Sequence, residues 1–202
     1  MAQSSTTIRS AASHKATTTG TVISFSQTGT EYKINSSNTT THSLGSYAQY
    51  DLITVSGSTN NNNTFTVKSV ATNSSYIIVE EMVTTESAGA TVSLDYVGFV
   101  TAKQQGDGYY SQADGVHTVA YHVSTTLNDD DNISLKMQGS LATTPTEDDW
   151  FDIDGTTINK DNIDGSTLVF SKNFTGNFVW VRAKCYNWTT ASSSVTKILY
   201  NH

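Results

Sequence analysis

Acidic residues in the second half of the chain are the first candidates for chemistry, because oxygen-rich loops can bind Ca²⁺. Two runs, Asp129–Asn132 and Glu147–Asp149, precede four further aspartates: Asp152, Asp154, Asp161 and Asp164. The EF-hand spacing D-x-[DN]-x-[DN]-G-x5-E is absent, and the Asp-Gly pairs here fit ordinary turns equally well. We therefore expect solvated hairpin loops and predict no metal-binding residues.

Histidines offer a second possibility for a metal site. His117 and His122 lie five positions apart within one expected strand, so their side chains point to opposite faces of the sheet and cannot share an ion. His14, His42 and His202 fall in the N-terminal segment, a loop and the last position. This spacing gives no reason to expect a histidine metal centre.

Catalytic motifs are missing from the sequence. There is no nucleophile elbow, P-loop, HExxH pair or GxGxxG in a strand–helix context. A pair of glycosidase carboxylates can be far apart in sequence, but two small β-modules leave little room for a deep cleft. We expect a protein that is not an enzyme, with no catalytic and no cofactor-binding residues, and keep a small glycan-active enzyme as a third hypothesis.

Aromatic residues could instead bind sugars by stacking. The candidates are Tyr109-Tyr110, the Tyr47–Tyr50 segment and Trp188. Buried or hinge packing is the commoner role of such rings, since they remove large apolar areas from water. We expect that role here and retain sugar contact as the alternative.

Composition limits the classes of partner. The formal net charge is -7 and the pI is near 5.0, so binding of nucleic acid through a basic face is not expected. No run of about 18 apolar residues occurs, which argues against membrane insertion. The N-terminus lacks the apolar core of a Sec-type signal peptide. Cys185, the only cysteine, is expected to be a buried thiol.

Period-2 alternation, rather than helical periodicity, dominates the chain. Phe65 and Val67 alternate with polar residues, as do Val92 and Leu94. The predicted strands are Thr21–Ser26, Thr30–Ile34, Asp51–Ser56, Thr64–Val70, Tyr76–Glu80, Thr91–Tyr96, Val116–Val123, Ile133–Gln138, Trp150–Ile153, Thr167–Ser171, Phe178–Tyr186 and Val195–Tyr200. The sequence therefore predicts an all-β protein of two small antiparallel β-barrel or β-sandwich modules with an extended N-terminal arm.

Three segments follow from these patterns. Residues 1–19 are mostly small and polar, with Ile8 the only large aliphatic residue after Met1. They are predicted to be an extended arm that is mobile in an isolated monomer and becomes ordered only where a partner chain supplies the contacts. Residues 20–102 form a small β-barrel or sandwich module. Residues 103–202 form an antiparallel β-sandwich, and a break in the strand pattern near residues 100–108 marks the boundary.

The predicted core of the second module rests on its large apolar residues. The strand containing Trp180 carries apolar residues on both faces, which predicts a central strand covered on each side. The expected contributors are Leu135, Trp150, Phe151, Leu168, Phe178, Val179, Trp180 and Val181.

Several segments of the second half resemble a known kind of protein. They are Asp107–Tyr110, Asp114–Val119, Met137–Pro145, Asp149–Ile153, Gly176–Ala183 and the last strand, Val195–Tyr200. Together they resemble a β-module of virion structural proteins from tailed bacteriophages, particularly contractile-tailed phages of marine cyanobacteria, and the likeness covers about half of the chain. In the first half, Asp51–Gly57 and Thr64–Val67 resemble small β-modules of phage tail and neck proteins.

The resemblance implies a virion protein that acts through assembly. The expected function is head decoration, or a neck or tail-associated role, with other virion proteins and copies of the chain itself as partners. Assembly in the host cytoplasm agrees with the absence of paired cysteines. The alternative is a carbohydrate-binding or host-adhesion module of a phage fibre or cell surface, in contact with host glycans.

Overall fold

The computed structural model describes residues 5–40, 42, 44–111, 115–124, 133–162, 168–189, 191 and 193–201. Nearly all of its regular structure is β, and the four helical elements are 3₁₀ turns of three or four residues. This confirms the predicted all-β class. Within the described part of the chain, no helix is both long and apolar enough to cross a membrane.

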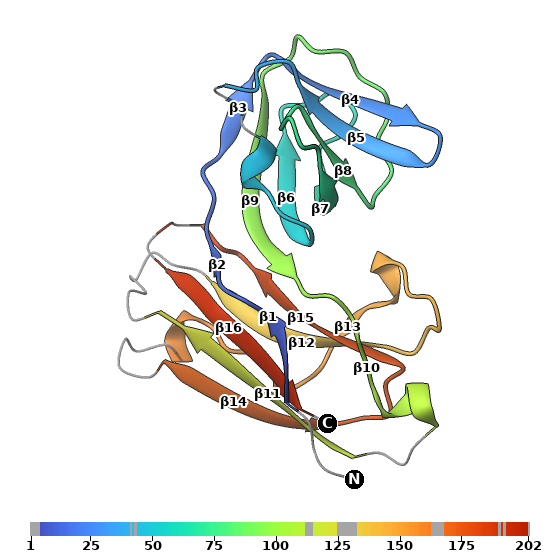
Figure 1. The fold of residues 1–202 in the computed structure, drawn as a ribbon, viewed down its shortest axis with the longest axis vertical. Coiled ribbons are helices and arrows are strands. Elements are labelled where there is room, and N and C mark those ends of the chain that lie inside the picture. The colour runs from blue at the N-terminus through green and yellow to red at the C-terminus, as the bar shows by residue number, and fades with distance from the viewer. Residues whose placement is uncertain are drawn as a thin grey trace. The chain divides into compact units, whose positions relative to one another are not determined.

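The chain divides into two compact units (Figure 1). One, which we call the continuous unit, is Lys15–Phe99. The other, the split unit, combines Met1–His14 with Val100–His202. The ranges predicted from sequence were 20–102 and 103–202, so the main difference is the assignment of the first 14 residues.

Antiparallel strands build the continuous unit. They are β3 (Thr18–Gly20), β4 (Ile23–Thr28), β5 (Glu31–Ser36), β6 (Asp51–Ser56), β7 (Thr64–Val70), β8 (Tyr76–Val79) and β9 (Val92–Val100), with the 3₁₀ turn η1 (Leu44–Ser46) before β6. The pairing order is β3-β9-β6-β7-β8-β5-β4. Alternate residues such as Phe65, Val67 and Leu94 are fully buried, as the period-2 pattern predicts.

A polar loop of the continuous unit is organised by Glu86. Its carboxylate accepts hydrogen bonds from the backbone N–H groups of Thr59 (2.9 Å) and Asn60 (3.0 Å), from the Ser58 hydroxyl (2.7 Å) and from Asn61 Nδ2 (3.1 Å). The backbone N–H of Thr59 is the largest influence that lowers the pKa of Glu86. The Asn-rich loop is therefore held by a charged acceptor.

We predict a pH-dependent contribution from Glu86. Its pKa is lower in the folded chain than in the unfolded chain, so its stabilisation is present above the unfolded pKa and is lost as pH falls through the folded value. The free energy of unfolding should be lower for Glu86→Gln than for the native chain at pH 7, and the difference should shrink on acidification below about pH 4. Urea titrations at a series of pH values measure this, and a difference independent of pH would contradict it.

Two sheets form the split unit. The first has the order β1-β16-β11-β14, with β2 also paired to β16: β1 (Ser5–Arg9), β2 (Ala12–Ser13), β11 (Val116–Val123), β14 (Val169–Thr175) and β16 (Ser194–Asn201). The second contains β10 (Gln104–Gln105), β12 (Ser134–Ser140), β13 (Phe151–Asp152) and β15 (Trp180–Tyr186), with β12 and β10 both paired to β15. The 3₁₀ turns are η2 (Asp107–Tyr110), η3 (Glu147–Asp149) and η4 (Lys160–Asn162).

The core of the split unit lies between these two sheets. Buried residues alternate along β11 and the first part of β12, including Val119 and Tyr121 of β11 and Leu135 and Met137 of β12. Cys185 is a fully buried thiol, as predicted. The arrangement is that of an antiparallel β-sandwich.

The N-terminal arm prediction needs correction. β1 pairs antiparallel with β16, from Ser5 opposite Asn201 to Arg9 opposite Ile198, and β2 pairs with the other end of β16. Ile8 is only 8% exposed. The chain's own last strand therefore supplies the contacts that the sequence argument assigned to a partner chain.

Ile8 should consequently stabilise the split unit. We expect Ile8→Ala to lower the free energy of unfolding by about 2 kcal/mol, near the lower end for buried aliphatic truncations because β1 lies at a sheet edge. Thr6→Ala, at an exposed position of the same strand, should change it by less than about 0.5 kcal/mol. Equal values for the two variants, measured by denaturant unfolding, would show that β1 is not docked in solution.

The predicted core also needs correction at several positions. Leu135, Phe178 and Val181 are buried as expected, but Phe151 is 43% exposed and Leu168 is 38% exposed. Trp150, Val179 and Trp180 are half-buried. For Trp180, the physical reason is that its face of β15 also holds the charged residues Arg182 and Lys184.

Candidate functional site

The acidic candidates do not form a metal site where the structure describes them. Glu147 pairs with Arg182, Asp149 accepts hydrogen bonds from Thr146, and Asp152 accepts one from Gln138 (2.9 Å). Asp154 and Asp161 are exposed. Within the described ranges no three potential ligands gather, while Asp129–Asn132 and Asp164 lie outside those ranges.

The histidine pair follows the strand parity that the sequence predicts. His117 is fully buried on the inner face of β11, and His122 on the same strand is half-buried. Burial, and then the nearby charge of Lys197, lower the pKa of His122. The two imidazoles therefore have separate environments.

Of the aromatic candidates, one pair is exposed. Trp188 is fully buried, and Tyr47 is 4% exposed, with its pKa raised to about 12 mainly by burial. In contrast, Tyr109 and Tyr110 of η2 are 46% and 48% exposed. Only this pair fits the sugar-stacking alternative.

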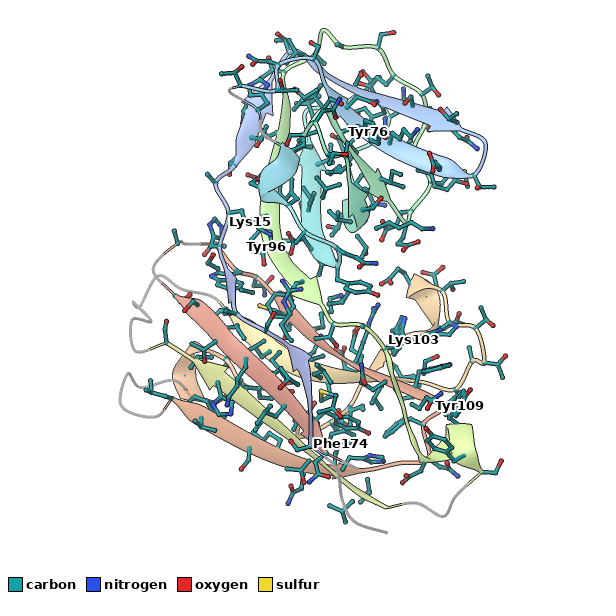
Figure 2. All side chains as sticks on the ribbon, in the orientation of Figure 1. Lys15, Tyr76, Tyr96, Lys103, Tyr109 and Phe174 are labelled. Atoms are coloured by element: carbon teal, nitrogen blue, oxygen red, sulfur yellow. The ribbon has the colours of Figure 1, made fainter. Side chains whose placement is uncertain are left out.

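Tyr109 and Tyr110 join Trp180 in a cluster that we call the aromatic platform. The ring centroids of Tyr109 and Trp180 are 4.9 Å apart with planes tilted by 57°, and those of Tyr109 and Tyr110 are 5.1 Å apart, edge to face. Lys103 Nζ lies 4.3 Å from the centroid of the Trp180 ring, near Tyr109 (Figure 2). The Trp180 indole N–H donates to the carbonyl oxygen of Thr143 (3.0 Å), which fixes the ring orientation.

A buried polar chain anchors the turn that carries the platform. Asp107, the first residue of η2, accepts a hydrogen bond from Gly115 N–H (2.7 Å), and its Oδ2 lies 3.3 Å from His117 Nε2. His117 Nδ1 is hydrogen-bonded to the Tyr200 hydroxyl (2.8 Å). The imidazole also stacks on Phe174, with centroids 5.1 Å apart and planes 19° apart.

This Asp107–His117–Tyr200 chain serves as an anchor. His117 is fully buried and Tyr200 is 1% exposed, so their polar atoms are shielded from solvent. Burial raises the pKa of Tyr200, which keeps its phenol neutral and a poor nucleophile. Its contribution is to hold η2, and with it Tyr109 and Tyr110, against the sandwich.

Close backbone packing holds the same turn from the other side. A Cβ atom at Gly106 would lie 2.5 Å from the carbonyl oxygen of Phe178, and one at Gly108 would lie 2.8 Å from that of Asn177. Gly108 N–H donates to the Phe178 carbonyl (2.8 Å). Glycine is thus required at both positions for the turn to approach β15 so closely.

A charged cluster on the outward face of β15 lies beyond the platform residue Trp180. Arg182 makes two 2.8 Å hydrogen bonds to Glu147, one of 3.0 Å to Gln138, and lies 4.2 Å from the Trp150 ring centroid. Burial, followed by the charges of Arg182 and Lys136, lowers the pKa of Lys184. Period-2 spacing of Trp180, Arg182 and Lys184 is the sequence signal for this shared outward face.

The arrangement can bind by stacking and hydrogen bonding. It presents exposed rings, an ammonium group and a rigid support. No model of a known protein family matches the chain, and no curated protein sequence is significantly similar to it.

Proposed function

We propose that the chain is a non-catalytic structural protein of a tailed-bacteriophage virion, in a head-decoration, neck or tail-associated role. One observation carries the proposal. Five of the six second-half segments that resemble phage virion β-modules are far apart in the sequence but meet around Phe178.

The contacts at Phe178 come from these five segments, and the sixth, Val195–Tyr200, adjoins them through the stacking of Tyr200 on His117. Its ring centroid lies 6.0 Å from that of Phe151 and 6.2 Å from that of His117. A Cβ at Gly139 would lie 2.6 Å from the ring, and one at Gly176 would lie 2.2 Å from it. Gly108 of η2 donates to its carbonyl. The residues that carry the resemblance to phage virion proteins therefore pack together in one structural unit. Such packing is expected if this unit is a β-module of the same kind.

The surface chemistry supports assembly as the mode of action. Charged residues make up 14% of the chain, below the average of about 25% for globular domains. Uncharged polar residues on strands offer hydrogen bonds without the desolvation penalty of burying ions at an interface. Such a surface suits contacts with other virion proteins and with further copies of the chain.

Particle location tests this proposal. Purified virions of the phage that encodes the chain should contain it at a fixed copy number, as measured by quantitative mass spectrometry. Antibody labelling in electron micrographs should mark one part of the particle. A chain found only in the unassembled fraction of infected cells would overturn the proposal.

The aromatic platform favours a second candidate function, that of a carbohydrate-binding or host-adhesion module. Aromatic rings held rigidly at a surface stack on sugar rings without a large ordering cost. Binding on a glycan array should be lost in Tyr109→Ala and Tyr110→Ala and retained in Phe151→Ala, an exposed ring outside the platform. Absence of any glycan signal from the native chain would eliminate this candidate.

A further inference from the structure

The exposed edges of the split unit differ in how well they are protected against strand pairing. Unprotected edge strands pair readily with another chain, and short length, bulges and charges prevent this. β10 and β13 have only two residues each, and β1 has a register irregularity between Thr7 and Arg9. β14 has seven residues in an unbroken register with β11, from Val116 opposite Thr175 to His122 opposite Val169. Among the described strands, only β11 pairs with it.

The outer face beside this edge carries no charge. Its residues alternate with the inward-facing ones of β11 and β14: Val116, Thr118, Ala120, His122, Val169, Ser171, Asn173 and Thr175. Val116 is 56% exposed and Val169 is 48% exposed, and Leu168, just before β14, is 38% exposed. Exposed apolar side chains thus gather at both ends of a regular edge whose outer face is uncharged and whose only charged residue is Lys172.

Charge identifies a suitable occupant. Each copy of the chain has a formal net charge of -7, which opposes association of two copies, so a contact between copies is least opposed where it brings no carboxylates together. The β11–β14 outer face meets that condition. When two copies of one strand pair antiparallel about a two-fold axis normal to the sheet, the outer faces of both copies lie on the same side of the joined sheet. β14 can therefore pair with β14 of a second copy.

We propose that β14 pairs antiparallel with β14 of a second copy, with the two-fold axis at Ser171, to form one continuous sheet across a dimer. In this register Phe170 lies opposite Lys172 of the second copy, and Val169 lies opposite Asn173 of the second copy. Lys172, the only charged residue of β14, then avoids its own counterpart, because like charges directly opposite destabilise a strand pair. The inference deepens the proposed function, since it assigns the surface through which copies associate.

Charge reversal at the axis tests the register. Ser171 is exposed, so Ser171→Lys and Ser171→Asp should fold normally. Sedimentation of the full chain over a concentration series should show a dimer for the native chain and at least about tenfold weaker dimerisation for each variant alone. An equimolar mixture of the two variants should recover the dimer, because unlike charges then meet at the axis.

Thr6→Lys, at an exposed position of β1 on the opposite edge of the same sheet, is the matched control and should dimerise like the native chain. A native chain that stays monomeric throughout, Ser171 variants that dimerise normally, or a mixture without recovery would overturn the inference. These outcomes are separate from particle location: a dimeric chain absent from virions would overturn only the proposed function, and a monomeric chain present in virions only the β14 contact.

Discussion

Trp188→Ala should lower the free energy of unfolding of the split unit by about 3–5 kcal/mol. The side chain is fully buried and is among the largest so buried in the described part of the chain. Asn187 adopts a positive φ of 57°, which turns the chain directly after β15 and directs the next residue inward. Truncation to alanine removes the hydrophobic stabilisation of the buried ring and also leaves a cavity. The loss of stability should therefore be in the upper range for single substitutions.

Trp180→Ala is the matched control for this prediction. The same side chain is removed, but Trp180 is half-buried and packs on Tyr109 and Lys103 at the surface. We expect a loss of about 1–2 kcal/mol, since only part of its area leaves water. Calorimetry or denaturant unfolding followed by circular dichroism measures both variants. A larger loss of unfolding free energy for Trp180→Ala than for Trp188→Ala would contradict the placement of Trp188 in the core and of Trp180 at the surface.

The error over Trp180 in the sequence-based prediction has a definite cause. Phe178 and Trp180 share a strand parity, and two aromatic rings suggest a buried face. Arg182 and Lys184 share that parity too, and their charges show that this face of β15 lies against polar groups such as Glu147 and not against the apolar core. Within β15 itself, the opposite parity, with Val181 and Cys185, is the fully buried face.

Local patterns predicted the strands because alternation is encoded within a few residues. β7, β11 and β12 lie close to the ranges expected from sequence, with the expected residues buried. The role of β1 was not predictable in this way. Its partner β16 lies at the other end of the chain, and a polar segment with the single aliphatic residue Ile8 carries no local signal of that pairing.

The anchor beneath the aromatic platform illustrates the same limit. Tyr109 and Tyr110 were singled out from sequence by their type alone. Their support by Asp107, His117 and Tyr200 joins a turn, a central strand and the last strand. Residues 83 positions apart, such as His117 and Tyr200, meet only through the long-range order of the sheet.

Glu147→Ala should lower the free energy of unfolding by about 2–3 kcal/mol. Removing one partner of a fully buried ion pair costs about 3–5 kcal/mol, and this pair lies somewhat below that range because the Glu147 side chain is 37% exposed. Arg182 is 4% exposed, so the substitution leaves a buried guanidinium beside Gln138 and the Trp150 ring without its counter-ion. Partial burial also limits screening, and 1 M NaCl should not remove the effect.

Asp148→Ala provides the control, because the adjacent residue of η3 has the same formal charge and is exposed. It should change stability by less than about 0.5 kcal/mol. The double variant Glu147→Leu with Arg182→Met should recover part of the loss, since replacing both ions leaves no buried charge without its counter-ion. If the double variant is as unstable as the sum of the two single variants, the pair does not act as a unit, and the outward face of β15 is stabilised chiefly by the stacking of Trp150 instead.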